Sequence, residues 1–285
     1  ATEEVLSKIG YADKSDIDAA VKSARSAYLK VWSKMPAKER GKYLYRIARI
    51  MQERAREFAV VETLDNGKPI RESRDTDIPL AAAHFFYHAG WADKLEFAGF
   101  GSKPKSLGVV GQVIPWNFPL LMLAWKIAPA LAAGNTVVLK PAEYTPLTAI
   151  RLGELALKAG IPEGVFNVLP GKGSIVGNRF VTHPLVRKVV FTGSTTVGKQ
   201  IMVGCADQVK RVTLELGGKS SNIIFADADV AKAAAGAPGA VFDNAGQDCC
   251  ARSRILVQKS AFDTFMEHFE VAVKKFRVED PNLAT

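Results

Sequence analysis

The fold is constrained most by an alternation of short β-branched runs with helical stretches, which begins near residue 106. Amphipathic segments such as residues 147–159 lie between several of these runs. Strands that alternate with helices in this way are typical of βαβ units on a mostly parallel sheet. The sequence therefore predicts an α/β fold. The six runs expected as strands are residues 108–114, 136–140, 165–169, 188–191, 211–216 and 222–225.

The part of the chain before Lys94 is predicted to be helical. Apolar side chains recur at helical spacing from residue 17 to residue 28, and Ser15 with Asp18 three residues later resembles a capping box. A second helix is expected to begin at Pro36. The Asn-Gly-Lys-Pro sequence at 66–69 predicts a turn. This region therefore contrasts with the alternating pattern that follows it.

The composition excludes several classes of protein. The 285 residues are 48% hydrophobic and 24% charged, which is ordinary for a soluble globular protein. The net charge of +9 is spread along the chain, unlike the basic block of a nucleic-acid-binding tail. We therefore expect no nucleic-acid partner. The basic excess is interpreted mainly as solvated surface, with an anionic ligand as the alternative.

Apolar runs and cysteines bear on the compartment. No apolar run reaches the roughly twenty residues that a membrane span needs, and the amino terminus lacks a basic-then-apolar secretion signal. The three cysteines, Cys205, Cys249 and Cys250, are odd in number and lack the spacing of a disulfide framework. We therefore expect a cytoplasmic protein without a membrane partner, in which Cys205 is a small core residue.

A candidate nucleophile and a candidate base stand out. Cys249 lies in Gly-Gln-Asp-Cys-Cys-Ala, and Glu215 lies in Leu-Glu-Leu-Gly-Gly-Lys. A thiol with an unperturbed pKa of about 8.5 is only a few per cent thiolate at neutral pH, so it needs a depressed pKa or a nearby proton acceptor. We expect Glu215 to be that acceptor, directly or through water.

Two polar positions follow expected strands. Asn117, in Ile-Pro-Trp-Asn-Phe-Pro, is either a turn-capping residue or the donor of an oxyanion hole. Lys140 and Glu143 lie where a strand ends, and open α/β sheets bind ligands at such ends. Glu143 could accept from both hydroxyls of a ribose and Lys140 could donate to one, although a charged strand end is also commonplace.

The segment Phe-Thr-Gly-Ser-Thr-Thr-Val-Gly-Lys-Gln at 191–200 follows a strand and opens a helix, where phosphate can bind. Three interpretations remain open: a structural turn, a cofactor pyrophosphate site and a nucleotidase loop. The last is weakened because Gln200 stands where magnesium needs a Ser or Thr hydroxyl. No metal site is expected, because His84 and His88 lack the HExxH glutamate and a third ligand.

Together these motifs, in this order, resemble the aldehyde dehydrogenase superfamily in its NAD(P)-dependent, non-acylating branch. The matching segments, IPWNFP, LKPAE, FTGSTTVGK, LELGGK and GQDCCA, fall within residues 108–257. The resemblance implies that Cys249 attacks an aldehyde while Asn117 and the Cys249 backbone amide stabilise the oxyanion, with Lys140 in the catalytic set. Hydride then passes to a nicotinamide, and Glu215 activates the water that hydrolyses the thioester.

The resemblance also implies a cofactor site and its preference. A carboxylate at Glu143 beside the adenosine ribose would repel a 2′-phosphate, which favours NAD over NADP. Glu215 argues against the branch that passes the acyl group to coenzyme A. The residues expected at the cofactor are Ile114, Pro115, Trp116, Lys140, Glu143, Phe191, Gly193, Ser194 and Gly217.

Against the family pattern the chain divides into four parts. Residues 1–94 are expected to be the helical part of the cofactor-binding domain, 95–107 a shortened linker or oligomerisation segment, 108–216 the Rossmann-like NAD-binding core, and 217–285 the start of the catalytic domain. The chain stops soon after Cys249, so we expect a fragment. Its full-length form is expected to be a homo-oligomer that uses a non-standard interface, because the linker is short. The short linker is also similar to that of unusually long aldehyde dehydrogenases with a second dehydrogenase-like module.

Two further expectations concern the nucleophile. Asp248 would raise the pKa of Cys249 if the two side chains faced each other, but neighbours on an extended segment are expected to point apart. An Asp at this position is also similar to some aminoaldehyde dehydrogenases. The alternatives to an aldehyde dehydrogenase are a catalytically incomplete binding or assembly module and a thiol esterase that needs no cofactor.

Overall fold

The computed structural model describes residues 4–99, 101 and 104–283, and its centre is a five-stranded parallel sheet. The prediction of an α/β fold is confirmed. The strand order is β3-β2-β1-β4-β5, so the chain runs outward from β1 to one edge and then returns to the other side of β1. The strands are β1 (Val109–Val113), β2 (Thr136–Lys140), β3 (Phe166–Val168), β4 (Val186–Gly193) and β5 (Arg211–Leu216).

The topology places a ligand-binding position between β1 and β4. Both strands are parallel neighbours, with Val113 opposite Phe191, yet their connections leave in opposite directions. In open α/β sheets such a switch point opens a crevice at the carboxyl ends of the strands. The loops that follow Val113, Lys140 and Gly193 therefore meet at one edge of the sheet.

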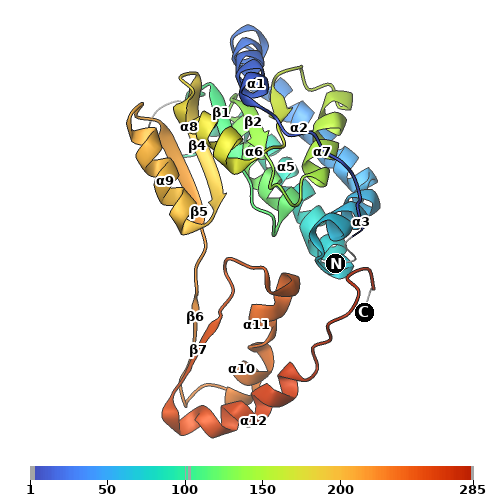
Figure 1. Ribbon diagram of the computed structural model, residues 1–285, viewed down its shortest axis with the longest axis vertical. Helices are drawn as coiled ribbons and strands as arrows, with labels where there is room; N and C mark the ends of the chain where they lie inside the picture. Colours follow the sequence, from blue (N-terminus) through green and yellow to red (C-terminus); the bar gives the residue numbers. More distant parts are fainter. Residues whose placement is uncertain (1–3, 100, 102–103, 284–285) are drawn as a thin grey trace.

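Helices cover both faces of this sheet (Figure 1). One face carries a two-layer packing of α2, α3, α5, α6 and α7 in a single apolar cluster with Val137 and Leu139. The other face carries α1, α8 and α9, which pack on Val109, Val138 and Val189. The helices of this unit are α1 (Lys14–Ala27), α2 (Ala37–Glu53), α3 (Ala55–Asn66), α4 (Ile70–Glu72), α5 (Ile78–Trp91), α6 (Pro119–Ala132), α7 (Leu147–Lys158), α8 (Asn178–Thr182) and α9 (Thr195–Ala206).

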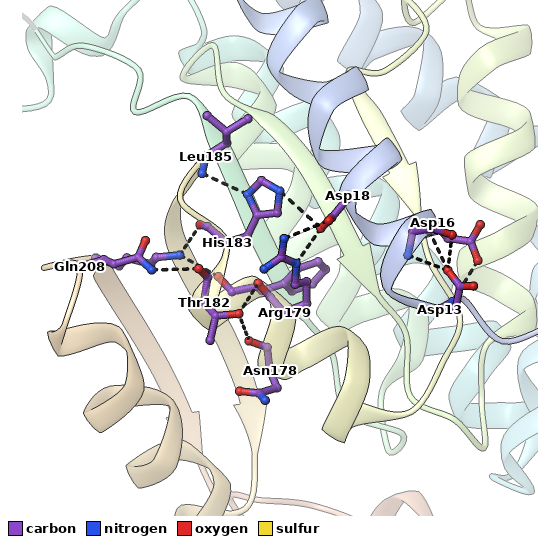
Figure 2. A network of polar contacts seen from close by, with 12 residues as sticks. Asp13, Asp16, Asp18, Asn178, Arg179, Thr182, His183, Leu185 and Gln208 are labelled. Carbon is purple, nitrogen blue, oxygen red and sulfur yellow. Dashed lines mark hydrogen bonds and ion pairs between the residues drawn. The ribbon is translucent and has the colours of Figure 1, made fainter.

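Helix α1 begins with a capping box, but one formed by different residues than expected. Asp13 accepts from the backbone of Asp16, and the Asp16 carboxylate accepts from the backbone N–H of Asp13. The expectation of Ser15 with Asp18 is wrong, because Asp18 instead forms a bidentate ion pair with Arg179 at 2.6 and 3.0 Å (Figure 2). This pair ties α1 to α8.

A second, smaller unit follows β5 (Figure 1). Its two parallel strands, β6 (Ser221–Ile224) and β7 (Arg254–Val257), pack with α10 (Val230–Gly236) and α12 (Phe262–Val273), while α11 (Gly239–Phe242) precedes the Cys249 loop. The chain then returns toward the first unit, where the Ile70 N–H donates to the Pro281 carbonyl at 2.7 Å.

The structure describes only part of the expected linker at 95–107. It begins with a single 3-10 turn at Leu95–Phe97. Phe100, Ser102 and Lys103, within the expected linker, lie outside the described residues. None of the helices in the described part of the chain is long and apolar enough to cross a membrane.

Candidate functional site

The loop that carries Asn117 joins β1 to α6. Pro119 is the first residue of α6, where its fixed φ suits a helix start and its missing N–H costs nothing. The half-buried Asn117 side chain points to the second unit, and its Nδ2 donates to the Gln247 carbonyl at 2.9 Å. This bond joins two segments 130 positions apart in the sequence, and it reaches the second segment at Gln247, two residues before Cys249.

Cys249 lies on a loop between α11 and β7. Asn244 and Ala245 both adopt left-handed backbone with φ of 56°, which turns the chain sharply before the cysteines. Cys249 and Cys250 are exposed, with their sulfurs 3.7 Å apart. The turn after β5 lies close by, since a Cβ on Gly218 would be 3.8 Å from the Cys249 carbonyl. Glu215 and Cys249 are therefore on adjoining segments.

The surroundings of Cys249 favour the protonated thiol. Partial desolvation, followed by the neighbouring Cys250 thiol and then the Asp248 charge, raises the pKa of Cys249 to about 11. The expectation that Asp248 and Cys249 point apart is wrong, because the Asp248 carboxylate and the Cys249 sulfur lie close together where the chain enters a turn at Cys249. The carboxylate oxygen and both sulfurs lie within 4.8 Å of one another, the one such group of possible metal ligands among the described residues.

Glu215 lies on the open face of β5, in a groove of about 360 Å³. Lys126 of α6 lines the same groove, is 7% exposed, and donates from Nζ to Thr192 Oγ1 at 2.6 Å. Burial lowers the pKa of Lys126 to about 8, although the negative charges of Glu215 and Cys249 oppose that shift. Lys126 is thus a buried amine within electrostatic reach of Glu215 and Cys249. The groove also includes Gln112, Trp125, Lys188 and Thr213.

Sequence reasoning missed Lys126. The signal was a single lysine in the otherwise apolar run of α6, where a charged side chain is unexpected unless it meets a partner.

A larger cleft of about 630 Å³ opens at the carboxyl ends of β1 and β4. Glu143 lies at its edge, where Oε1 accepts from the Gly173 N–H at 2.8 Å. Lys140 is buried, donates to the Pro141 carbonyl at 2.9 Å, and lies 3.9 Å from Glu143 Oε1. The cleft is lined further by Val113, Lys172, Ser174, Phe191, Val197, Gln200 and Ile201.

Gly193 and Ser194 follow Phe191 in the chain and do not themselves line this cleft. A Cβ on Gly193 would lie 2.5 Å from the Phe191 ring, so only glycine allows the ring its position. Ser194 is the N-cap of α9, and its Oγ accepts from the Val197 N–H at 3.4 Å. The structure therefore brings Glu143 and Phe191 to one cleft, with the amino end of α9 beside them.

The remaining residues expected at the cofactor are not in the lining of this cleft. Ile114 and Pro115 begin the Asn117 loop, Trp116 is 47% exposed, and Gly217 follows β5 in an exposed turn. They lie instead along the segments that carry Asn117 and Glu215.

The fold and site define a class of protein. A parallel sheet with a cleft at its switch point, beside a cysteine, a carboxylate and an amide on neighbouring loops, is an α/β architecture with a ligand cleft at the carboxyl ends of its strands. Comparison with known proteins gives the family.

The model of the aldehyde dehydrogenase family matches residues 1–285, and the chain belongs to that family. It is 46% identical over 290 residues to the cytosolic 10-formyltetrahydrofolate dehydrogenase of Xenopus tropicalis, covering 97% of this chain and 32% of that protein. Among solved structures, an NAD+ complex of a Bacillus cereus aldehyde dehydrogenase has a TM-score of 0.93 at 43% identity, covering 99% of this chain and 59% of that one. The aldehyde dehydrogenase KauB of Pseudomonas aeruginosa has a TM-score of 0.91 at 44% identity, covering 97% and 58%.

Proposed function

We propose that the protein is an NAD-dependent aldehyde dehydrogenase, which oxidises an aldehyde to a carboxylic acid through a thioester on Cys249. The observation that carries the proposal is the 2.9 Å hydrogen bond from Asn117 Nδ2 to the Gln247 carbonyl, because it brings an amide donor to the nucleophile loop. Family membership supports the reaction class. Because the chain spans 32% of one matched relative and 59% of another, the activity of the whole protein is part of the proposal.

The cleft at the switch point fits a dinucleotide. The Glu143 carboxylate at the edge of the cleft, whose Oε1 accepts from the Gly173 N–H, is suited to the two hydroxyls of a ribose and unsuited to a 2′-phosphate. The amino end of α9 offers backbone N–H groups to a pyrophosphate. The matched Bacillus cereus structure is an NAD+ complex. When bound, NAD accepts the hydride.

In the first half of the reaction Cys249 becomes the nucleophile. With a pKa of about 11 the thiol must lose its proton to a base, and Glu215 takes it directly or through water. The sulfur then bonds to the aldehyde carbon while the carbonyl electron pair moves to oxygen. Asn117 Nδ2 and the Cys249 N–H donate to that oxyanion, and Lys140 lies behind the cleft as a further cation.

In the second half Glu215 serves the thioester. After the hydride has left the carbon, the C=O bond reforms and the acyl group remains on sulfur. Glu215 first releases the thiol proton to solvent, and then takes a proton from water as the water oxygen bonds to the acyl carbon. The C–S bond breaks to release the acid, and Glu215 returns its proton to the sulfur to restore the thiol. Lys126 lines the same groove as Glu215.

The domain division belongs to the same proposal. We place the cofactor-binding part at residues 1–94 and 108–216, the linker at 95–107 and the start of the catalytic part at 217–285. The exposed thiols of Cys249 and Cys250 favour a reducing cytoplasm.

The test is NADH formation by the protein expressed from its complete gene, with aliphatic, aromatic and amino aldehydes. Wild type and Cys250→Ala are expected to reduce NAD, whereas Cys249→Ala loses activity by about four orders of magnitude or more. Binding of NAD without NADH formation from any aldehyde would instead identify a non-catalytic module of the family. Equal loss in both cysteine variants would overturn the choice of nucleophile.

A further inference from the structure

Three ionisable side chains are fully buried behind the Asn117 loop, and none of them lines the groove at Glu215 or the cleft at the ends of β1 and β4. Glu62, Lys68 and Asp77 are 0%, 0% and 1% exposed. Lys68 Nζ forms an ion pair with Asp77 and lies 4.3 Å from the centroid of the Phe118 ring. A buried ion pair is weak as a source of stability, because desolvation offsets most of its attraction. The burial of these three side chains therefore needs an explanation other than stability.

The same chain segment holds the backbone of the Asn117 loop at three places. Lys68 Nζ donates to the Asn117 carbonyl at 3.2 Å, and the side-chain amide of Asn66 donates to the Trp116 carbonyl. Both carboxylate oxygens of Glu62 lie 3.3 Å from the Leu120 N–H. Every one of these bonds runs from the end of α3, or the turn after it, to the loop.

The turn that follows α3 directs Lys68 toward the Asn117 loop. Gly67 ends α3 with a left-handed φ of 82°, which lets the chain reverse and sends Lys68 inward. Asp77 meets Lys68 from the end of the π-helical turn Ser73–Asp77. The Lys68 ammonium is thus fixed by its counter-ion before it reaches the Asn117 carbonyl.

The hydrogen bond from Lys68 acts on the backbone of Asn117, the residue proposed to donate to the oxyanion. An oxyanion donor works only if it is aimed before the charge develops, and the direction of the Asn117 side chain follows from its backbone. From the opposite side, Asn244 Nδ2 donates to the same Asn117 carbonyl at 2.9 Å. The carbonyl is therefore fixed by one donor from each unit.

We propose that Lys68, held by Asp77, is a positioning residue that aims the Asn117 amide at the oxyanion, with Glu62 and Asn66 fixing the same loop; this rests on the proposed function. Lys68 touches no reacting atom and acts through Asn117. Its removal should lower kcat by misdirecting one donor, and should leave NAD binding intact.

The test is a double-mutant cycle in the protein expressed from its complete gene. Lys68→Met is combined with Asp77→Asn, so that no unpaired carboxylate replaces the ion pair. This variant is expected to lower kcat about 10- to 100-fold, since a misplacement of about 1 Å costs that much, with the Kd for NAD unchanged. In an Asn117→Ala background the same pair of changes should alter kcat by less than about twofold, because the group it aims is gone.

The matched control is Lys210→Met. Lys210 Nζ also donates to backbone carbonyls, those of Phe180 at 3.0 Å and His183 at 2.5 Å, but beside α8 and not at the Asn117 loop. This variant should lower the unfolding temperature and leave kcat within about twofold of wild type.

Equal losses of kcat in the wild-type and Asn117→Ala backgrounds, from a wild type that forms NADH, would overturn the inference alone. A wild type that forms no NADH from any aldehyde would overturn the proposed function and this inference with it. If the variant that combines Lys68→Met with Asp77→Asn does not fold, Asn66→Ala tests the positioning of the loop by the same cycle. It removes the bond to Trp116 without uncovering a charge, and its loss of kcat should likewise vanish without Asn117.

Discussion

The two sides of the site are built in different ways. The Asn117 loop lies between the buried residues Ile114 and Leu120, and its backbone is held by side chains of a large apolar core. The Cys249 loop is exposed and belongs to a unit whose buried apolar core consists of Ile224, Ala234, Ala237 and Phe265.

The contrast shows how the work of positioning is divided. The amide donor is fixed by burial and by charge-assisted bonds, which are strong where water is excluded. The nucleophile is placed mainly by the left-handed turn at Asn244 and Ala245 and by that turn's contact with Asn117. Substitutions of buried charged residues are thus expected to perturb the Asn117 loop most. The Cys249 loop is expected to respond to changes of backbone conformation and of nearby exposed charge.

After the loss of the nucleophile itself, the largest effect is expected at Glu215, the base proposed to act on both the thiol and the water. Glu215→Gln keeps the size of the side chain but cannot take a proton, so kcat should fall about 10²- to 10⁴-fold. If Glu215 acts mainly on water, rapid mixing should still show a burst of NADH before the slow turnover. Thr213→Val, on the same open face of β5, is the control and should keep the steady rate. A rate unchanged in Glu215→Gln would show that another group is the base.

Buried charge on the Asn117 side should appear as a dependence of stability on pH. Burial raises the pKa of Glu62 from 4.5 to about 7, against the attraction of Lys68 and with the repulsion of Asp77. The folded state then keeps a proton that the unfolded state releases, so the Glu62 contribution to stability falls by about 3 kcal/mol as pH rises from about 4.5 to 7.

Urea denaturation at pH 5 and pH 8 measures this contribution. In Glu62→Gln the loss of unfolding free energy between the two pH values should shrink by about 3 kcal/mol. Glu154→Gln removes an exposed carboxylate that pairs with Arg151, and it should keep the wild-type difference. The same pH difference in Glu62→Gln and wild type would contradict the shift.

Backbone conformation should dominate on the Cys249 side. Asn244→Ala loses both hydrogen bonds of Nδ2, to the carbonyls of Asn117 and Gln247, and places alanine at a φ of 56°. The loop should open more easily by about 2 kcal/mol, seen as faster amide hydrogen exchange in residues 243–250. Asn244→Gly should cost about 1 kcal/mol less, because it removes the bonds without the strain.

A matched change at the next residue separates strain from bonding. Ala245 has the same φ of 56°, so Ala245→Gly should slow exchange by relieving strain worth about 0.5–1 kcal/mol. Faster exchange in that variant would show that the left-handed conformation is not the main constraint on the loop.

The sequence predicted the sheet well because its strands are local patterns. The expected strands at 136–140 and 211–216 coincide with β2 and β5, since each is a β-branched run bounded by turn or polar residues. The helix cap was less predictable. Asp13, Ser15, Asp16 and Asp18 all favour a helix start, and the contact of Asp18 with Arg179, 161 positions away, decided which pair forms the box.

The site was predictable only in part, because some of its residues are brought together by contacts between segments distant in sequence. The motifs around Asn117, Glu215 and Cys249 could be found in the sequence. Lys126 had only the weak signal of a single lysine in an apolar helix, and Lys68 could not be separated from solvated lysines. Their burial depends on helices that meet only in the fold. The π-helical turn at Ser73–Asp77, which brings Asp77 to Lys68, has no signal in local composition either.

The smallest effect is expected from the exposed charge beside the nucleophile. Because the Asp248 carboxylate is one of the groups that raise the pKa of Cys249, Asp248→Asn should lower that pKa. In a Cys250→Ala background, the pH at which iodoacetamide alkylation reaches half its maximal rate should move down, and the rate at pH 8 should rise a few-fold. Asp243→Asn, an exposed change earlier in the same loop, should leave the profile in place. An unchanged profile in Asp248→Asn would show that the Asp248 carboxylate does not control the ionisation of the Cys249 thiol.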